Sequence, residues 1–384
     1  MAAKAATTRF NGRLRGRKPW IARIPRAERG VKFVWRAVAR HRDLAIHYNP
    51  ATFASEVFMN PVQPITVAQY GIGPIGAEIA RLLLTKPWLR VVAAVDVDPN
   101  KIGKDLGEVI GLDREVGIKV TGELTTKTDV VCHSTGSRLR DVSVQLKDLL
   151  ERGCHVVSTC EELSFPLDQQ IREELQQVAR TNNVTLLGTG VNPGFVMDKL
   201  PLTVTSVCQR IDSVEIIRIQ NASTRREPLQ RKVGAGMTPD EFRAAVDAGR
   251  IKHMGLRESL MMVGKGLGAE FESVSDETIE PIIAEREVRT QYLTCAPGQV
   301  AGVHQTIYGR GKIDVSLELR MYVGAEDVAA DRVIVHGVPD VEMVIKGGVH
   351  GDRATAAMVV NAIPRVVSAR PGVLTMDDIP ISFR

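Results

Sequence analysis

The sequence has no apolar run that could cross a membrane and too few cysteines for a disulfide framework. A membrane-spanning helix needs roughly 18 or more consecutive apolar residues, and no stretch of the 384 residues meets that requirement. The five cysteines are odd in number, and none of them forms a C-x-x-C pair. These absences predict a cytoplasmic protein with reduced thiols and without a membrane span or a zinc ribbon.

Metal-ligand spacing is also missing from the sequence. None of the eight histidines stands in H-x-x-x-H or an equivalent pattern. His133 follows an apolar run, where a histidine is more often a strand-end residue than a ligand. Cys160 has no neighbouring histidine that would activate its thiol. We therefore expect no metal site and no cysteine nucleophile.

Acidic residues are scarce in the first 60 positions, which contain 13 Lys and Arg but only Glu28, Asp43 and Glu56 as acids. An arginine-rich N-terminal segment of this kind is typical of a disordered extension, a transit peptide or a nucleic-acid-binding arm. No aromatic interleaving, zinc-finger spacing or helix-turn-helix pattern supports the last of these. We predict that residues 1–60 form a basic extension that the rest of the chain does not need, and we expect no nucleic-acid partner.

From Pro64 onward, apolar runs alternate with amphipathic segments. Residues 65–69 and 91–99 predict two buried strands, and three more are predicted in the segments that contain VVCH, HVVS and VTLLG. Strands that alternate with helices imply right-handed crossovers and a parallel sheet that is covered on both faces. We predict an α/β fold in which residues 61–195 form a Rossmann-type, doubly wound parallel sheet.

Beyond about Phe195 the pattern changes to longer runs with partial alternation, such as SVEIIRIQNAS and KIDVSLELRMYVG. These runs predict a second, α+β domain built on an open mixed sheet, in residues 196–351, for substrate binding and dimerisation. An open sheet of this kind favours a homodimer. The last apolar helix predicts that residues 352–384 return to the first domain.

The glycine-rich stretch GIGPIG directly follows the first predicted strand and opens a helix. In that setting the glycines permit a tight turn and a close approach to a pyrophosphate, and the helix N-terminus attracts negative charge. Asp96 lies 20 residues beyond Gly76, at the end of the next strand, where a carboxylate binds ribose hydroxyls. We predict a dinucleotide site formed by Gly71, Gly73, Ile75, Gly76 and Asp96.

The residues near Asp96 leave the choice of coenzyme open. An acid repels a 2′-phosphate and so favours NAD, whereas Lys101 and Lys104 could bind that phosphate if their loop bends back. We expect NAD, with use of NADP as the alternative. Ser134 and Thr135 follow the VVCH run at the carboxyl edge of the sheet, where ligands gather. We predict that they contact ribose or nicotinamide; a helix cap made by the same hydroxyls is the alternative.

Two adjacent acids, Glu161 and Glu162, follow the fourth predicted strand in the segment STCEELSFP. Residues at this place face the nicotinamide end of the crevice, and Glu162 would point elsewhere if the chain stays extended. A buried carboxylate is unfavourable without a partner, and a cationic substrate would be one. The alternative is that EELSFP begins a helix whose dipole stabilises both acids.

Six segments, in this order, resemble the 2,4-diaminopentanoate dehydrogenase family and its native amine dehydrogenases, which are distantly similar to dihydrodipicolinate reductase. The segments are GIGPIG, VDVDPNKIGKDLGE, STCEELSFP, GTGVNPGFVMD, QNASTRREPLQRKVGAGMTP and GGVHGDRATAAMVVNAIPRVV. The resemblance covers roughly residues 62–384. It implies an NAD(P)-dependent reaction that interconverts a small ketone or aldehyde plus ammonia with a primary amine.

The resemblance also implies roles for single residues. The family's catalytic glutamate corresponds to Glu161, the asparagine near the substrate to Asn192, a pocket arginine to Arg218 and a pocket histidine to His304. From its own residues, the basic segment RREPLQRK (225–232) is predicted to be a solvated loop, and binding of a phosphate or carboxylate is the alternative. Two other functions stay open: a dihydrodipicolinate-reductase-like enzyme, and a module that binds NAD(P) without turnover.

Overall fold

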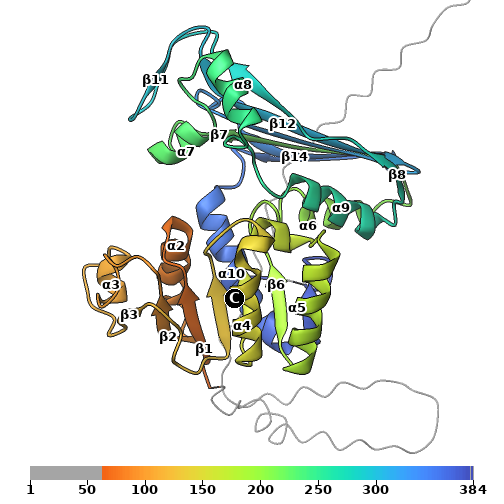
Figure 1. Cartoon of the computed structure of the whole chain (residues 1–384). Helices are drawn as coiled ribbons and strands as arrows, with labels where there is room; N and C mark the ends of the chain where they lie inside the picture. Colours follow the sequence, from red (N-terminus) through yellow and green to blue (C-terminus); the bar gives the residue numbers. More distant parts are fainter. Residues whose placement is uncertain (1–62, 381, 384) are drawn as a thin grey trace, which may run out of the picture. The chain divides into compact units, whose positions relative to one another are not determined.

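The computed structural model describes residues 63–380, 382 and 383, so the prediction for residues 1–60 lies outside the described residues. The first sheet has seven strands in the order β16-β6-β5-β4-β1-β2-β3 (Figure 1). All of its strand pairs are parallel. The bounds are Ile65–Tyr70 (β1), Leu89–Val95 (β2), Val120–Thr121 (β3), Val130–His133 (β4), His155–Ser158 (β5), Thr185–Gly188 (β6) and Gly372–Leu374 (β16). The predicted doubly wound α/β fold is confirmed.

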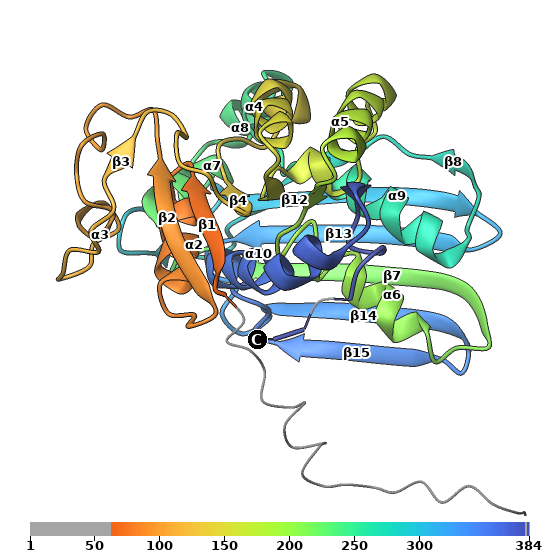
Figure 2. The same ribbon diagram turned by 90° about the horizontal axis from the view of Figure 1, so that it is seen from below.

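Helices cover both faces of this sheet because its strands carry apolar side chains on both sides. Helices α4 (Leu139–Glu151) and α5 (Gln169–Thr181) pack on one face, as Figure 2 shows. Helices α2 (Pro74–Leu83) and α10 (Gly351–Ser368) pack on the other. Helix α10 comes from the end of the chain and contacts β4, β5 and β6, while the short α3 (Leu106–Val109) follows β2.

The second sheet is mixed, with the order β15-β14-β7-β13-β12-β8 and with β9 paired to β12. Strands β7 and β13 run parallel, whereas the other pairs are antiparallel. This arrangement confirms the predicted open mixed sheet. The bounds are Arg210–Asn221 (β7), Phe271–Val274 (β8), Thr278–Ile283 (β9), Val300–Gly311 (β12), Asp314–Tyr322 (β13), Ala330–Val338 (β14) and Val341–Lys346 (β15); β10 (Val288–Arg289) and β11 (Thr294–Cys295) form a separate pair.

One face of the second sheet packs against α6 (Lys199–Thr205) and α9 (Leu256–Leu267). Its core includes Ile216 and Leu317 of the strands with Leu260 of α9, all fully buried. Because side chains alternate along a strand, residues next to these buried positions face the other side of the sheet. The sheet therefore has one apolar face and one more polar face.

Local sequence features at their N-termini stabilise two short helices of this domain. Helix α8 (Pro239–Asp247) begins with a capping box, in which Thr238 and Glu241 each accept a hydrogen bond from the other's backbone N–H. Helix α7 (Glu227–Lys232) has proline in its first turn, together with Glu227. The prediction of a loop over residues 225–232 was therefore wrong for most of this segment.

No helix in the described part of the chain is long and apolar enough to cross a membrane. All five cysteines are free thiols, and four of them are buried. Within residues 63–380, no group of three or more His, Cys, Asp or Glu side chains is arranged to hold a metal ion.

Candidate active site

A cavity of about 370 Å³ lies beyond the carboxyl ends of the parallel strands. One side is lined by residues that follow β1, β4, β5 and β6, and the other by side chains of β7, β12 and β13. In open α/β sheets this edge, next to the switch in strand order between β1 and β4, is where ligands bind. The residues that line this cavity are therefore candidates for ligand binding and catalysis.

The glycine-rich turn shapes one wall of the cavity. Gly71 has φ +84°, and a Cβ on it would lie 2.6 Å from the carbonyl oxygen of Ser134. A Cβ on Gly76 would overlap the carbonyl oxygen of Gly71. Gly73 is the N-cap residue of α2, whose first turn has no acidic residue, and Gly73 and Ile75 both line the cavity. The backbone N–H groups of this helix end are thus open to an anion such as a pyrophosphate.

Ser134 and Thr135 also line the cavity, and their contact with ribose or nicotinamide stays a prediction. The Ser134 hydroxyl donates to the carbonyl of Gly71 at 2.9 Å, so it holds the glycine turn against the end of β4. The alternative that these hydroxyls cap a helix is wrong. Helix α4 begins later, at Leu139, whose backbone N–H donates to the Glu162 carboxylate at 2.7 Å.

His133 is fully buried and belongs to a network beneath the cavity. Its Nδ1 lies 2.9 Å from the Ser158 hydroxyl, and its Nε2 lies 3.0 Å from the side-chain oxygen of Gln145. Burial lowers the pKa of His133 to about 4, so the ring is neutral near pH 7. Ser158 in turn accepts a hydrogen bond from the backbone N–H of Cys160. The network therefore fixes the turn that leads to Glu161.

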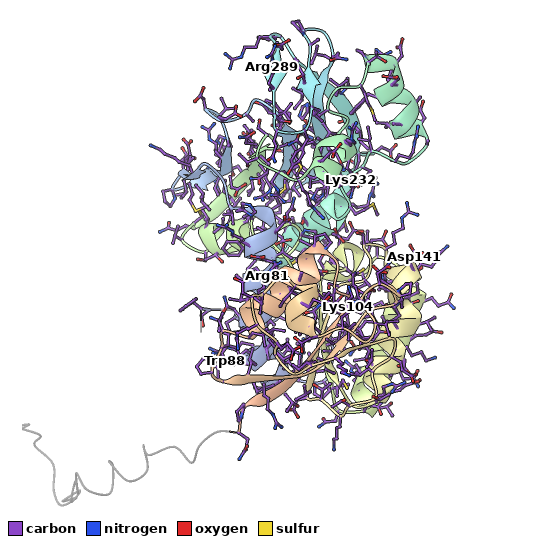
Figure 3. All side chains as sticks on the ribbon, turned by 90° about the vertical axis from the view of Figure 1, so that its left-hand side faces the viewer. Arg81, Trp88, Lys104, Asp141, Lys232 and Arg289 are labelled. Atoms are coloured by element: carbon purple, nitrogen blue, oxygen red, sulfur yellow. The ribbon has the colours of Figure 1, made fainter. Side chains whose placement is uncertain are left out.

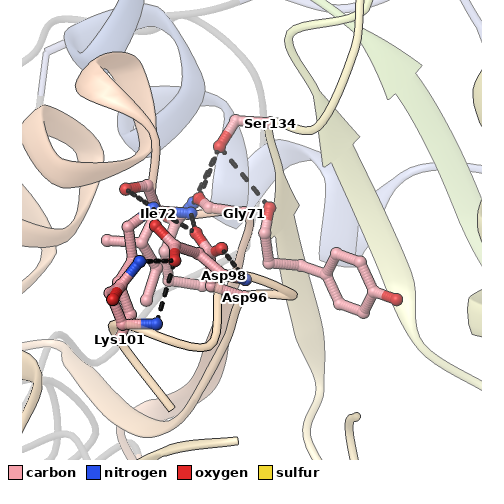
Figure 4. Close-up of polar contacts among 9 residues, drawn as sticks. Gly71, Ile72, Asp96, Asp98, Lys101 and Ser134 are labelled. Atoms are coloured by element: carbon pink, nitrogen blue, oxygen red, sulfur yellow. Dashed lines mark hydrogen bonds and ion pairs between the residues drawn. The ribbon is translucent and has the colours of Figure 1, made fainter. Parts of the chain in front are cut away.

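Asp96 lies at the end of β2 and is largely buried. Its carboxylate accepts hydrogen bonds from the backbone N–H groups of Ile72 (2.7 Å) and Asp98 (2.9 Å) and from Lys101 Nζ (2.9 Å), as Figure 4 shows. Burial by itself raises the pKa of Asp96, but these hydrogen bonds outweigh it and lower the pKa below its usual value. Asp96 is thus an ionised group beside the glycine turn, as a ribose-binding carboxylate must be.

Glu161 and Glu162 begin a 3-10 turn, Glu161–Ser164, closed by the hydrogen bond from Leu163 N–H to the Cys160 carbonyl. The chain is therefore not extended here, and EELSFP begins a short helix, as the alternative stated, although the two side chains do separate. Glu162 stabilises the N-terminus of α4, whereas Glu161 lines the cavity. Burial raises the pKa of Glu161, and a hydrogen bond from Ser137 and the charge of Lys232 partly oppose the rise.

Asn192 and Arg218 line the same cavity as Glu161. Both amide atoms of Asn192, Nδ2 and Oδ1, are buried and have no hydrogen-bond partner among the described residues. Such atoms are rare in folded proteins unless a ligand or water completes them. Arg218 is 3% exposed, and its Nη1 lies 2.6 Å from Asp331 Oδ1, so its charge is already balanced.

His304 lies outside the cavity lining, contrary to the prediction. It stands on β12 next to Val303, which lines the cavity, so strand alternation turns His304 toward the other face of the sheet. There its Nε2 lies 2.8 Å from Glu318 and its Nδ1 lies 3.8 Å from Glu280.

His253 lines the cavity and was not predicted. Its backbone N–H and carbonyl both bond to the side chain of Gln305, each at 3.0 Å, and its Nδ1 has no partner within the described residues. Burial lowers the pKa of His253 to about 4, so a neutral imidazole faces the cavity. No sequence motif links His253 to Glu161. The two residues line the same cavity only because of the tertiary packing.

Basic side chains surround the cavity entrance on the side of α7. Arg225 pairs with Asp352 at 2.6 Å, and Lys252 pairs with Glu277 at 3.2 Å. Arg226 and Lys232 are exposed and have no ion-pair partner in the described structure. Figure 3 shows Lys232 among the side chains of the second sheet's domain. The cavity lining thus carries two cations without an ion-pair partner among the described residues, and the charge of one of them, Lys232, acts on Glu161.

The arrangement fits a nicotinamide dinucleotide. The glycine turn leaves room where side chains would clash, and the ionised Asp96 lies where ribose hydroxyls bind. The unpartnered amide of Asn192 offers a donor and an acceptor to a carboxamide or a substrate. Glu161 then provides one half-buried carboxylate in the same cavity.

Comparison with known proteins supports this description. Residues 195–383 match the family model for the 2,4-diaminopentanoate dehydrogenase C-terminal domain. The 2,4-diaminopentanoate dehydrogenase of Acetoanaerobium sticklandii is 29% identical over 334 residues, which cover 83% of this chain and 94% of that protein. The amine dehydrogenase of Streptomyces virginiae is 24% identical, over 83% of this chain and 96% of its own length.

A solved structure agrees with the sequence relatives. The amine dehydrogenase from Mycobacterium smegmatis superposes with a TM-score of 0.74 and 26% identity, over 83% of this chain and 97% of that one. The resemblance found in the sequence is thus confirmed. The chain is similar to the 2,4-diaminopentanoate dehydrogenases and amine dehydrogenases, and residues 195–383 match the C-terminal domain model of the former.

Proposed function

We propose that the chain is an NAD(P)-dependent amine dehydrogenase, which interconverts a ketone or aldehyde plus ammonia with a primary amine. One observation carries the proposal: Glu161 is a half-buried carboxylate, with a raised pKa, in the cavity that also contains the glycine turn. The names of the two sequence relatives, 2,4-diaminopentanoate dehydrogenase and amine dehydrogenase, support the same chemistry.

The coenzyme would be held by the glycine turn, by Asp96 at the ribose and by residues near Ser134 and Thr135. A bound nicotinamide coenzyme supplies the hydride for the reduction and accepts it in the reverse direction. The chain's own groups orient the substrate and manage charge and protons. Asn192 is suited to hold either the carboxamide of the coenzyme or the oxygen or nitrogen of the substrate, since both of its amide atoms are free.

Glu161 would act at the substrate nitrogen. Its carboxylate takes a proton from ammonium, and the ammonia set free attacks the carbonyl carbon while one of its protons passes to the carbonyl oxygen to give the carbinolamine. Glu161 then returns its own proton to the carbinolamine hydroxyl, which leaves as water and converts the carbinolamine to an iminium. The ionised carboxylate then stabilises the positive iminium in a site with little water. A raised pKa suits this exchange, because a carboxyl group with its usual pKa would return the proton poorly near neutral pH.

The cavity entrance favours a substrate that carries a carboxylate. Arg226 and Lys232 are the cations there without an acidic partner among the residues described. A carboxylate bound near them would leave an amine within the cavity, beside Glu161. This charge pattern, acid inside and base at the rim, is complementary to an amino acid with an additional amine and less so to a simple amine.

The exposed face of the second sheet supports a homodimer. Val344, Val328 and Tyr308 are each at least 40% exposed on strands or turns of this sheet. Exposed apolar groups of this kind mark association surfaces when they gather on one face. The mass of the full chain in solution, from light scattering during gel filtration, tests the assignment.

The decisive experiment combines an assay with two neighbouring variants. The full chain, NADH or NADPH, ammonium and a panel of keto acids, ketones and aldehydes should oxidise the coenzyme, followed by its absorbance. Glu161→Gln should lower kcat at least about 100-fold and leave coenzyme binding intact. Glu162→Gln, the matched control, should retain most of the activity because Glu162 bonds to α4.

Other outcomes identify other functions. Turnover of a lysine-pathway dihydrodipicolinate and of no carbonyl with ammonia would assign a dihydrodipicolinate-reductase-like activity. Coenzyme binding without any turnover would assign a binding module. Loss of activity in Glu162→Gln with full activity in Glu161→Gln would overturn the role given to Glu161.

A further inference from the structure

The carboxylate of Asp96 has a cation in direct contact with it before any ligand is present. Lys101 Nζ lies 2.9 Å from Asp96 Oδ2 and 3.2 Å from the carbonyl oxygen of Ile72, in the glycine turn (Figure 4). It also lies 3.7 Å from Asp98 Oδ2. One ammonium therefore connects the two acids at the end of β2 to the turn that would cradle the pyrophosphate.

The loop that carries Lys101 is held in place by its own hydrogen bonds. The backbone N–H groups of Lys101 and Ile102 both donate to the carbonyl of Asp98, and the side chain of Asp98 accepts two bonds from Asn100. Gly103, with φ +85°, reverses the chain immediately afterwards. The lysine thus extends from a defined turn, and its contact with Asp96 is built into the loop.

The contact changes what the carboxylate can accept. Oδ2 of Asp96 already accepts from Ile72 N–H and from Lys101, and Oδ1 accepts from Asp98 N–H. A carboxylate offers about four lone-pair positions, so one remains for a ribose hydroxyl. Lys101 is 26% exposed on its side chain, so its ammonium can turn from Asp96 toward a group in solvent.

Lys104, three residues further on, is different. Its Nζ lies 3.2 Å from Glu108 Oε1, and both side chains are at least 51% exposed. Within the described structure its ammonium forms no ion pair with Asp96, and Figure 3 shows it among the side chains of the first sheet's domain. The two lysines, which the sequence could not separate, are therefore inequivalent.

We propose that Lys101 is a coenzyme-specificity residue, which allows the Asp96 site to accept a 2′-phosphate as well as a free ribose hydroxyl. The proposal rests on the proposed nucleotide site. With a 2′-hydroxyl, Lys101 stays on Asp96 and the hydroxyl donates to the free position on Oδ1. With a 2′-phosphate, which carries close to two negative charges, the ammonium moves to the phosphate and offsets the repulsion from Asp96 and Asp98.

The alternative is a site in which Asp96 alone determines the coenzyme specificity and excludes NADP. A lone carboxylate next to a phosphate is repelled without compensation. In this chain the cation nearest to that carboxylate is already within hydrogen-bond distance, so compensation requires a rotation of one side chain and no movement of the backbone. The geometry therefore favours dual use of NAD and NADP.

The test measures dissociation constants of NAD and NADP for the full chain by calorimetry, which requires no turnover. Lys101→Met should weaken NADP binding by about fivefold or more, the order of one partly exposed ion pair. It should change NAD binding by less than about twofold. Lys104→Met, a matched loss of charge in the same loop, should leave both constants unchanged. Lys101→Arg should retain most of the NADP affinity.

Two results would overturn the proposal. One is equal weakening of NAD and NADP in Lys101→Met, which would make the lysine a structural support of the turn. The other is wild-type binding of NAD with no measurable binding of NADP. Thermal unfolding of each variant without nucleotide checks that the loop is intact. Because binding is measured directly, the specificity role can fail while amine turnover is present, or hold while turnover is absent.

Discussion

Arg218 of β7 and Asp331 of β14 are register partners on adjacent strands and form an ion pair of 2.6 Å with both side chains almost fully buried. Each also bonds to the backbone of Val349, through its carbonyl (3.0 Å) and its N–H (2.7 Å) respectively. The pair therefore links two strands of the second sheet to the segment that enters α10. Arg218 also lines the cavity, so this ion pair stabilises the second sheet and holds a residue of the site in place.

Asp331→Ala leaves the guanidinium of Arg218 buried without an anion. We expect the free energy of unfolding to fall by about 3–5 kcal/mol, measured by urea denaturation. Replacing both partners, as in Arg218→Met with Asp331→Leu, should recover more than half of the loss, because no unpaired charge remains. A loss below about 1 kcal/mol in Asp331→Ala would contradict the burial described above.

We expect Lys232 to lower KM for substrates that carry a carboxylate and to leave KM for substrates without one unchanged. Lys232→Met removes an uncompensated charge at the cavity entrance, so KM for an amino acid with a second amine should rise about tenfold. KM for a matched amine without the carboxylate should stay the same. Arg231→Met is the control, since Arg231 pairs with Glu227 at 2.7 Å and does not line the cavity. Equal effects on both substrates would argue against a carboxylate position at the rim.

Glu258 should make stability depend on pH. It lies in the first turn of α9 and is 9% exposed, and burial, with the nearby charges of Glu162 and Glu277, raises its pKa from 4.5 to about 7. The folded state then binds a proton more tightly than the unfolded state. Ionised Glu258 therefore lowers the free energy of unfolding. This loss of stability is absent below pH 4.5 and complete above about pH 7, where it is on the order of 3 kcal/mol.

The check is the free energy of unfolding of Glu258→Gln and of the wild type at about pH 5 and about pH 8. The variant should be the more stable protein at the higher pH, and the difference should shrink at the lower one. Glu272→Gln, a change at an exposed acid of the neighbouring β8, should have little effect at either pH. A constant difference between variant and wild type would rule out titration of Glu258 in this range.

The nucleotide half of the site could be predicted because its pieces are close together in the sequence. The strand, the glycine turn and the helix of residues 65–83 follow one another directly, and Gly71 and Gly76 are required by contacts within that unit or with the end of β4. Asp96 follows from the same pattern, one strand later. The predicted role of His304 failed because β12 carries side chains to both faces, and a resemblance cannot fix which one faces a cavity.

The substrate half depends on contacts between distant segments. Sequence alone determined the alternation that makes a doubly wound sheet, the glycine cradle and the presence of an acid after the fourth strand, because these depend on neighbours along the chain. Only the tertiary structure decided that Glu161 and Glu162 begin a 3-10 turn, that His253, Arg226 and Lys232 line the same cavity as Glu161, and that Lys101 bonds to Asp96. The physical reason is that burial and charge pairing are set by which elements pack together, and the local pattern leaves that choice open.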